Sequence, residues 1–234
     1  MPSALTTIKL LGLVGVASYA VARLAVRLRL VAWQRAHVVA VPRHALPAMP
    51  RGFSVIELDA KALAQRPIDI GVAQQAARFA QGMRCLGAFT ATDQLAGVIW
   101  VSAGPCTEGE LPLRFQPPAG CGWDTGMWVH PDHRLGRAFA ALWAGVGAWM
   151  NTRGLEWSAS SIADYNLTSL AAHRRLGMAE LGRFVALRVG RWYWIAAGPA
   201  PWRLALPGQI IDWPVPAPTD ATASIGQAAP SLAA

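Results

Sequence analysis

Lysine is nearly absent from this 234-residue chain, and no run of basic residues is interleaved with aromatic side chains. Lys9 and Lys61 are the only lysines, so the formal net charge of +8 comes almost entirely from arginine. Arginine suits phosphate and other anionic groups because its guanidinium is a rigid, planar donor of several hydrogen bonds. An anionic ligand or lipid headgroups would explain this bias, whereas the lack of any recognition motif argues against nucleic acid.

Cysteine is equally scarce. Cys85, Cys106 and Cys121 form no C-x-x-C pair, and none has a nearby histidine at metal-ligand spacing. Neither a disulfide framework nor a zinc site is therefore expected. We expect a chain that works in a reducing compartment and holds no metal.

The apolar run Leu10–Ala22 near the amino end is short, since a spanning helix needs roughly 20 apolar residues. Three interpretations stay open. Residues 8–30 could span or dip into a membrane, a signal peptide could end at Ala20-Val21-Ala22, or an amphipathic helix could dock on its own domain or on a bilayer surface. We favour membrane association, in which the arginines after the run keep the chain in the cytoplasm.

Composition divides the chain into four segments. An apolar and basic helix is expected over residues 1–36, and an extended, proline-bearing linker over residues 37–52. Residues 53–197 have the pattern of one α/β domain. Residues 198–234 are rich in proline and alanine and are expected to be disordered, unless Trp202–Trp213 packs back as an arm.

Hydrophobic periodicity places the elements of the 53–197 domain. The helix over residues 137–151 has one buried stripe at helical spacing, made of Phe139, Leu142, Val146 and Trp149. A short turn at residues 92–94 joins two apolar strands into a hairpin. In chain order we expect strand 53–58, two short helices between 61 and 83, hairpin strands 85–91 and 95–102, strand 123–129, helix 137–151, strand 155–162, helix 166–176 and strands within 179–195.

The turn Val129-His-Pro131-Asp-His-Arg134 lies between a strand and the long helix. Proline ends the strand's hydrogen-bond ladder, and the amide groups at the following helix start attract anions. This turn resembles the V-x-P-x-x-R turn of GNAT N-acyltransferases. The resemblance implies the GNAT α/β fold, with a mixed central sheet and helices on both faces. It also implies that the turn holds the pyrophosphate of acetyl-CoA and that Met127, Trp128 and Val129 pair with the pantetheine arm.

The same turn departs from the family pattern after its arginine. Where the family has R-G-x-G-x-G or A, this chain has Arg134, Leu135, Gly136, Arg137 and Ala138, a loop shortened by one residue. Gly136 and Ala138 remain as small positions that let backbone amides approach a diphosphate, and Arg134 and Arg137 could add charge. The donor therefore stays open between acetyl-CoA and another acyl thioester.

A second match begins at Asn166 and resembles the family segment N-x-x-A-x-x-x-Y-x-x-L-G-F. The resemblance implies that Asn166 and Ser169 face the CoA arm. His173 stands at the tyrosine position, a replacement associated with the phosphinothricin-acetyltransferase branch, and could act as the general acid toward the departing thiolate. The alternative is a structural or solvent-facing histidine.

Asp124 occupies the position at which that branch carries an acidic residue, five places before the valine of the turn. A carboxylate there could take a proton from the incoming ammonium group as general base. Its alternative is an ordinary aspartate at a strand start or turn. Glu108 and Glu110, in the preceding loop, are alternative bases or contacts for a cationic substrate.

Three functions follow from these patterns. The first is transfer of an acetyl or other acyl group from acyl-CoA to the primary amine of a small molecule or peptide. The second is a membrane-associated enzyme that uses long-chain acyl-CoA or acyl-ACP, working at the cytoplasmic face of the inner membrane. The third is a non-catalytic GNAT module whose tryptophans, among them Trp192, Trp194 and Trp202, bind a partner.

Overall fold

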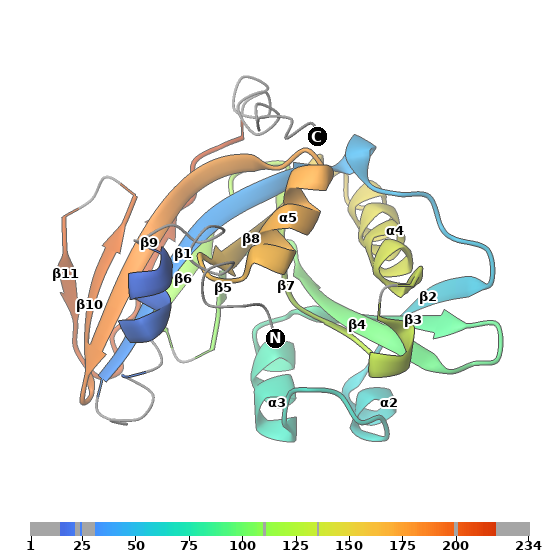
Figure 1. Ribbon diagram of the computed structural model, residues 1–234, viewed down its shortest axis with the longest axis horizontal. Helices are drawn as coiled ribbons and strands as arrows, with labels where there is room; N and C mark the ends of the chain where they lie inside the picture. The colour runs from blue at the N-terminus through green and yellow to red at the C-terminus, as the bar shows by residue number, and fades with distance from the viewer. Residues whose placement is uncertain are drawn as a thin grey trace. The chain divides into compact units, whose positions relative to one another are not determined.

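The computed structural model describes residues 15–21, 24, 31–109, 111–134, 136–198 and 201–218 (Figure 1). These residues form two compact units. We call Val41–Gly109 with Gln116–Ser160 the central unit. Met1–Ala40, Glu110–Phe115 and Ser161–Ala234 make up the terminal unit, as far as they are described.

The central unit is built on a mixed sheet in the order β8-β7-β4-β3-β2. Neighbouring strands from β2 to β7 run antiparallel, and β7 and β8 run parallel. The strands are β2 (Phe53–Leu58), β3 (Arg84–Thr90), β4 (Leu95–Ser102), β7 (Cys121–Val129) and β8 (Trp157–Ala163), and a two-residue strand, β5 (Cys106–Thr107), precedes β7. The expected mixed α/β architecture is confirmed.

Helices cover both faces of this sheet, with α4 (Ala138–Asn151) on one and α2 (Ala60–Ala64) and α3 (Val72–Ala80) on the other (Figure 1). On the α3 face, the rings of Phe79 and Trp100 meet edge to face with centroids 4.9 Å apart. On the α4 face, a Cβ on Gly145 would lie 2.5 Å from Val55 Cγ1, so the helix comes this close because the residue is glycine. The predicted α4 stripe is buried except for the half-buried Phe139.

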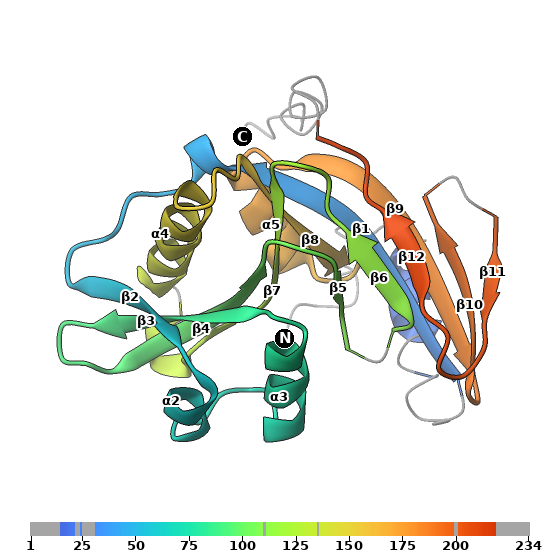
Figure 2. The same ribbon diagram turned by 180° about the vertical axis from the view of Figure 1, so that it is seen from behind.

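The terminal unit contains an antiparallel sheet in the order β11-β10-β9-β1. One face is covered by β6 and β12, which pair with each other (Figure 2). The rings of Phe115, Phe184 and Trp213 pack there, with centroids 5.6 to 6.2 Å apart. The elements are β1 (Val31–Pro42), β6 (Leu113–Gln116), α5 (Leu167–Arg175), β9 (Ala179–Val189), β10 (Trp192–Ala197), β11 (Arg203–Ala205) and β12 (Ile211–Pro214), with a short helix at 15–21.

The chain before Phe53 differs from expectation. Residues 31–36, assigned to an amino-terminal helix, and residues 37–42, assigned to a linker, form β1, which is paired with β9. The reason is the apolar run Val38–Val41, which is fully buried, whereas the prolines begin only where the strand ends. Of the predicted helix, residues 15–21 and 24 are helical; the rest of 1–30 lies outside the described residues. No helix within the described part of the chain is long and apolar enough to cross a membrane.

The carboxyl-terminal tail also differs from the expected disorder, over residues 201–218. This segment forms β11 and β12 instead of being disordered, and Trp213 and Val215 are buried. The proposed arm that packs back is thus present, because the large apolar surface of Trp213 offsets the ordering of a proline-rich chain. Residues 219–234 lie outside the described part.

Candidate active site

The strand β7 is paired with β8 over only the first third of its length. Their parallel register runs from Cys121↔Trp157 to Trp123↔Ala159, and β7 continues to Val129. A strand edge without a neighbour presents N–H and C=O groups to any extended, amide-bearing ligand. The segment from Asp124 to Val129 can therefore accept a ligand as if it were a further strand, and it contains the predicted Met127, Trp128 and Val129.

A bulge at Gly126 bends β7 at this point. The register with β4 passes from Val98↔Trp128 to Trp100↔Thr125, so β7 has one residue more than its partner. Gly126 has φ +57°, and a Cβ there would lie 2.2 Å from Nη1 of Arg78. The backbone conformation thus favours glycine, and an added Cβ would have to displace the Arg78 guanidinium.

The strand then enters the predicted anion-binding turn. A 3-10 turn, η2 (Pro131–His133), follows β7, and Arg134 Nε donates to the Val129 carbonyl at 3.4 Å. Arg137, at the N-cap of α4, makes no capping hydrogen bond with its side chain. The start of α4 therefore offers its amides and positive dipole end to an anion. Leu135 lies outside the described residues.

The side chains around this turn suit an anion. Arg134, Gly136 and Arg137 are exposed, and Ala138 is buried as the first helical residue. The Arg137 guanidinium carbon lies 5.9 Å from the centre of the Phe53 ring. A cavity of about 370 Å³ lies beside the turn and is lined by Arg66, Pro67, Gln94, Leu95, Trp128, His130, Asp132 and His133.

Asp124 follows the last registered pair of β7 and β8, so it lies where the two strands begin to part. Its side chain is 4% exposed, and Oδ2 accepts a hydrogen bond from Ser158 Oγ at 2.7 Å. Burial raises the pKa of Asp124 to about 7; the Ser158 hydrogen bond lowers it and the charge of Glu108 raises it. This aspartate is not a residue of a turn, and its carboxyl can gain or lose a proton near neutral pH.

The alternative carboxylates are placed differently. Glu108 is half-buried, and its Oε1 accepts from Trp123 Nε1 at 2.9 Å. It acts on Asp124 through its negative charge. Glu110 lies outside the described residues.

The second motif forms the start and body of α5 in the terminal unit. Asn166 caps the helix, since its Oδ1 accepts from the Ser169 amide at 3.2 Å. His173 is buried, and its Nδ1 lies 2.8 Å from the Ser169 carbonyl oxygen. Because a carbonyl only accepts, Nδ1 carries the proton in this contact.

Burial lowers the pKa of His173, and the Ser169 hydrogen bond opposes this in part. His173 is therefore neutral at neutral pH, with its proton on Nδ1. The other ring nitrogen, Nε2, is then an acceptor. This is the state of a base and not of the acid that the sequence predicted, so a donor role requires His173 to take up a proton first.

Arg78 was not predicted as a site residue from the sequence. Its guanidinium carbon lies 5.2 Å from the centre of the Trp100 ring, and its Nη1 is buried without a hydrogen-bond partner among the described residues. Burial lowers the pKa of Arg78, against the charges of Glu108 and Asp69. An arginine in a short surface helix gives no sequence pattern that could have placed it against the β7 bulge.

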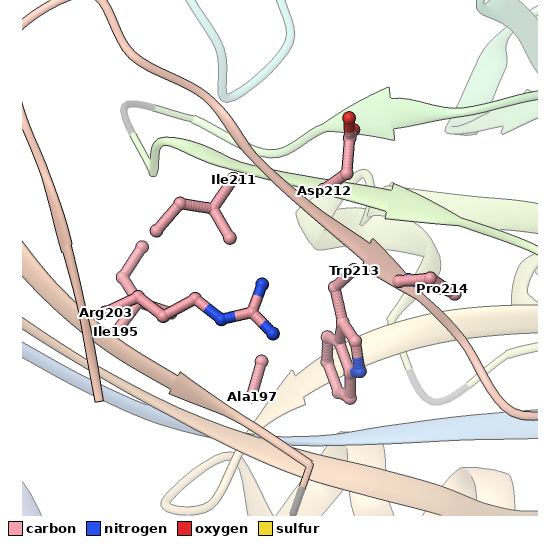
Figure 3. Close-up of a pocket in the computed structure, with 7 residues that line it drawn as sticks. All are labelled: Ile195, Ala197, Arg203, Ile211, Asp212, Trp213 and Pro214. Carbon is pink, nitrogen blue, oxygen red and sulfur yellow. The ribbon is translucent and has the colours of Figure 1, made fainter. Parts of the chain in front are cut away.

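A second cavity, of about 250 Å³, lies in the terminal unit between β10, β11 and β12 (Figure 3). Its walls include Ile195, Ile211 and Trp213, and the guanidinium of Arg203 points into it (Figure 3). Asp212 accepts from Arg114 Nη2 at 2.7 Å. None of the predicted site residues lines this cavity.

No protein-family model matches the chain, and no curated protein matches it by sequence. Solved structures that it resembles include a tandem GNAT protein from the clavulanic acid biosynthesis pathway, at 21% identity and TM-score 0.44 over 72% of this chain and 55% of that one. A GCN5-related N-acetyltransferase from Sphaerobacter thermophilus is 20% identical with a TM-score of 0.43, over 67% of this chain and 53% of that one. A GCN5-related N-acetyltransferase from Kribbella flavida is 14% identical with a TM-score of 0.41, over 76% of this chain and 65% of that one.

The chain thus spans about half to two thirds of the length of these proteins. At such low identity and TM-score, the similarity assigns neither a family nor an activity to this chain.

Proposed function

We propose that this chain is a GNAT-type N-acyltransferase that moves an acetyl or other acyl group from a CoA thioester to a primary amine. One observation carries the proposal: β7 leaves β8 after Trp123 and then turns at Pro131 into α4, whose first turn has no side-chain cap. An open strand edge that leads into an anion site matches a ligand with an amide-bearing arm and a diphosphate. Acyl-CoA is such a ligand.

Each part of the donor has a candidate partner. The backbone of Met127, Trp128 and Val129 pairs with the pantetheine amides. Arg134, Gly136, Arg137 and Ala138 receive the diphosphate. The resemblance of the second motif adds Asn166 and Ser169 as further candidates for contacts with the arm. A backbone amide near Val129 polarises the thioester carbonyl and stabilises the tetrahedral intermediate.

Asp124 is the proposed general base, because its raised pKa lets it accept the proton of an incoming ammonium group near neutral pH. The neutral amine then attacks the thioester carbonyl, and the thiolate of CoA leaves. The attacking nitrogen, positively charged in the tetrahedral intermediate, gives its extra proton to Nε2 of His173, and His173 returns this proton to the thiolate sulfur as the C–S bond breaks, which fits the neutral resting state of the imidazole. The acceptor is a small-molecule or peptide amine.

The shortened turn supports a second donor class. With Gly136 and Ala138 as its small residues, the turn has fewer places where backbone can approach a diphosphate than the three-glycine family pattern. A long-chain acyl-CoA or acyl-ACP would bind more through its acyl chain and less through this turn.

The test is the release of CoA, measured with a thiol reagent, from acetyl-CoA and from long-chain acyl-CoA in the presence of a panel of primary amines. We expect release that depends on the amine and rises with pH through about 7, as Asp124 ionises. The variant Arg134→Gln/Arg137→Gln should raise KM for the donor, whereas Arg51→Gln, at an exposed arginine of the same unit, should not. A non-catalytic module would release no CoA with either donor.

A further inference from the structure

Among the residues that the structure describes, none covers one face of the terminal unit's sheet over β9, β10 and β11. Cross-strand pairs place Trp33, Leu187, Trp194 and Leu204 in one row, so their side chains share a face. Phe184 and Ile195 belong to the opposite face, which packs against β6 and β12 (Figure 2).

The uncovered face is apolar and rich in tryptophan. Trp192 stands two residues from Trp194 on β10 and opposite Val189 on β9, so both continue the row. Trp202 and Leu206, which flank β11, are also exposed, Trp202 by 52%. We call Val189, Trp192, Trp194, Trp202, Leu204 and Leu206 the tryptophan face; each is at least one-third exposed.

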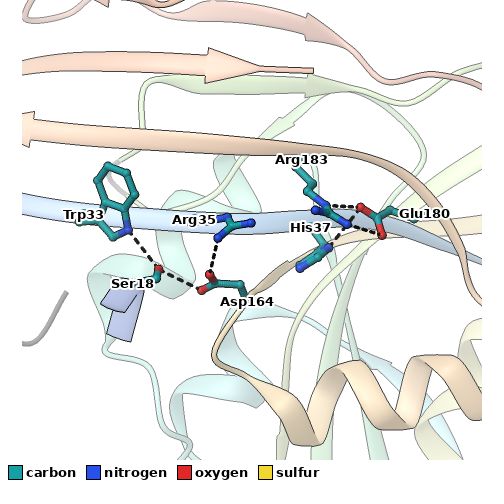
Figure 4. A network of polar contacts seen from close by, with 7 residues as sticks. All are labelled: Ser18, Trp33, Arg35, His37, Asp164, Glu180 and Arg183. Atoms are coloured by element: carbon teal, nitrogen blue, oxygen red, sulfur yellow. Dashed lines mark hydrogen bonds and ion pairs between the residues drawn. The ribbon is translucent and has the colours of Figure 1, made fainter. Parts of the chain in front are cut away.

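The short helix at 15–21 lies on this same side of the sheet. Trp33 Nε1 donates to Ser18 Oγ at 3.1 Å, and Ser18 Oγ donates to Asp164 Oδ1 at 3.2 Å (Figure 4). Arg35 Nη1 lies 3.7 Å from Asp164 Oδ2 and completes the attachment (Figure 4). Outward from this network, the side chains of Tyr19, Val21 and Leu24 are exposed, which extends the apolar surface.

The two chain segments that form most of this surface contain few or no acidic residues. Residues 181–211 contain no aspartate or glutamate. Arg191 is exposed in the turn between β9 and β10, at the edge of the tryptophan face, and Arg183 pairs with Glu180, whereas Arg188 and Arg203 belong to the opposite face. Residues 1–56 likewise contain no acidic residue. Both segments belong mainly to the terminal unit, so an anionic surface would meet Arg191 and no acidic residue from either segment.

We infer that the tryptophan face binds the surface of an anionic lipid bilayer. Tryptophan prefers the membrane–water interface because its ring is apolar and its N–H is polar. Arg191 at the edge of the face then gains from the negative potential of anionic headgroups, and apolar burial adds to this attraction. The contact is peripheral and is made by a sheet face. It is therefore independent of acyl transfer and of any spanning helix.

The test uses the full chain and sedimentation with vesicles of phosphatidylcholine alone or of equal parts phosphatidylcholine and phosphatidylglycerol. We expect binding to the anionic vesicles that weakens as salt is raised from about 0.1 M to about 0.5 M, because salt screens the arginine contacts. The variant Trp192→Thr/Trp194→Thr/Trp202→Thr should partition at least about tenfold less well. The control Met49→Thr/Ile56→Thr/Val72→Thr removes exposed apolar side chains of the central unit and should bind like wild type.

Leu204→Asp gives a second, milder variant, which adds a negative charge to the part of the face on β11 and should also weaken binding. Circular dichroism and size-exclusion chromatography confirm that each variant is folded. The inference is overturned if wild type ignores anionic vesicles, or if both tryptophan-face variants bind like wild type, which would place the contact elsewhere. A wild-type dimer that the triple variant dissociates, without vesicle binding, would identify the face as a contact between copies and would also overturn it.

Discussion

Replacing Asp124 by asparagine should stabilise the protein at alkaline pH and inactivate it at the same time. The carboxyl is buried, and its pKa is raised from an ordinary 3.8 to about 7. A group whose pKa is higher in the folded chain favours folding most when it is protonated. This contribution is present below about pH 4 and is lost as the pH rises through about 7.

The size of the effect follows from the shift. A difference of about three pKa units corresponds to about 4 kcal/mol between the two protonation states. Asparagine is neutral at every pH and its carbonyl can still accept from Ser158 Oγ, so Asp124→Asn removes the titration and keeps the contact. A buried amide that lacks an acceptor costs about 1–3 kcal/mol, but this cost does not depend on pH.

The assay is urea unfolding of wild type and Asp124→Asn between pH 4 and pH 8. As the pH rises, wild type should lose about 4 kcal/mol of its free energy of unfolding relative to the variant. Turnover of the variant should fall by about 10²- to 10⁴-fold, the range for loss of a general base. A free-energy difference that stays flat with pH would refute the buried, titrating carboxyl, and unchanged turnover would refute its role as base.

Three further predictions concern the same structure. Ser158→Ala removes the hydrogen bond that lowers the pKa of Asp124, so the rising limb of the pH–rate profile should move to higher pH; a limb that stays in place would contradict this. Gly126→Ala should lower the free energy of unfolding by about 1–3 kcal/mol. Gly82→Ala is the control, because Gly82 has a similar positive φ but open space around it, and it should lower the free energy of unfolding by less. Equal losses would show that no side chain presses on the bulge. Trp213→Ala should cost about 3–5 kcal/mol and expose the segment after Ala197 to limited proteolysis, and wild-type resistance would mean that the arm does not depend on its tryptophan.

Except for the short strands β5 and β6, the elements between β2 and β9 could be predicted from periodicity to within a few residues. The hairpin strands β3 and β4, the helix α4 and the capped helix α5 each have a local pattern that tertiary packing reinforces. Asp124 and His173 could be named from motifs, because their residue types and spacing are visible in the sequence.

Other features depend on contacts between distant segments and have no local pattern. The strand β1 was missed because prolines at its end outweighed the buried run before them. The tail strands were missed because a proline-rich composition does not indicate how deeply a single residue, Trp213, is buried. The neutral state of His173, the raised pKa of Asp124 and the placement of Arg78 all follow from burial, which a sequence pattern does not quantify.

The central claim is that the open edge of β7 and the start of α4 bind a CoA thioester. The melting temperature of the full chain with and without acetyl-CoA tests it most directly. A ligand at about 100 times its Kd stabilises the native state by about 2.7 kcal/mol, which is a rise of about 5–10 °C for a chain of this size. We predict such a rise for wild type, and a smaller one for Arg134→Gln/Arg137→Gln at the same concentration. An unchanged melting temperature with acetyl-CoA and with long-chain acyl-CoA would contradict the claim.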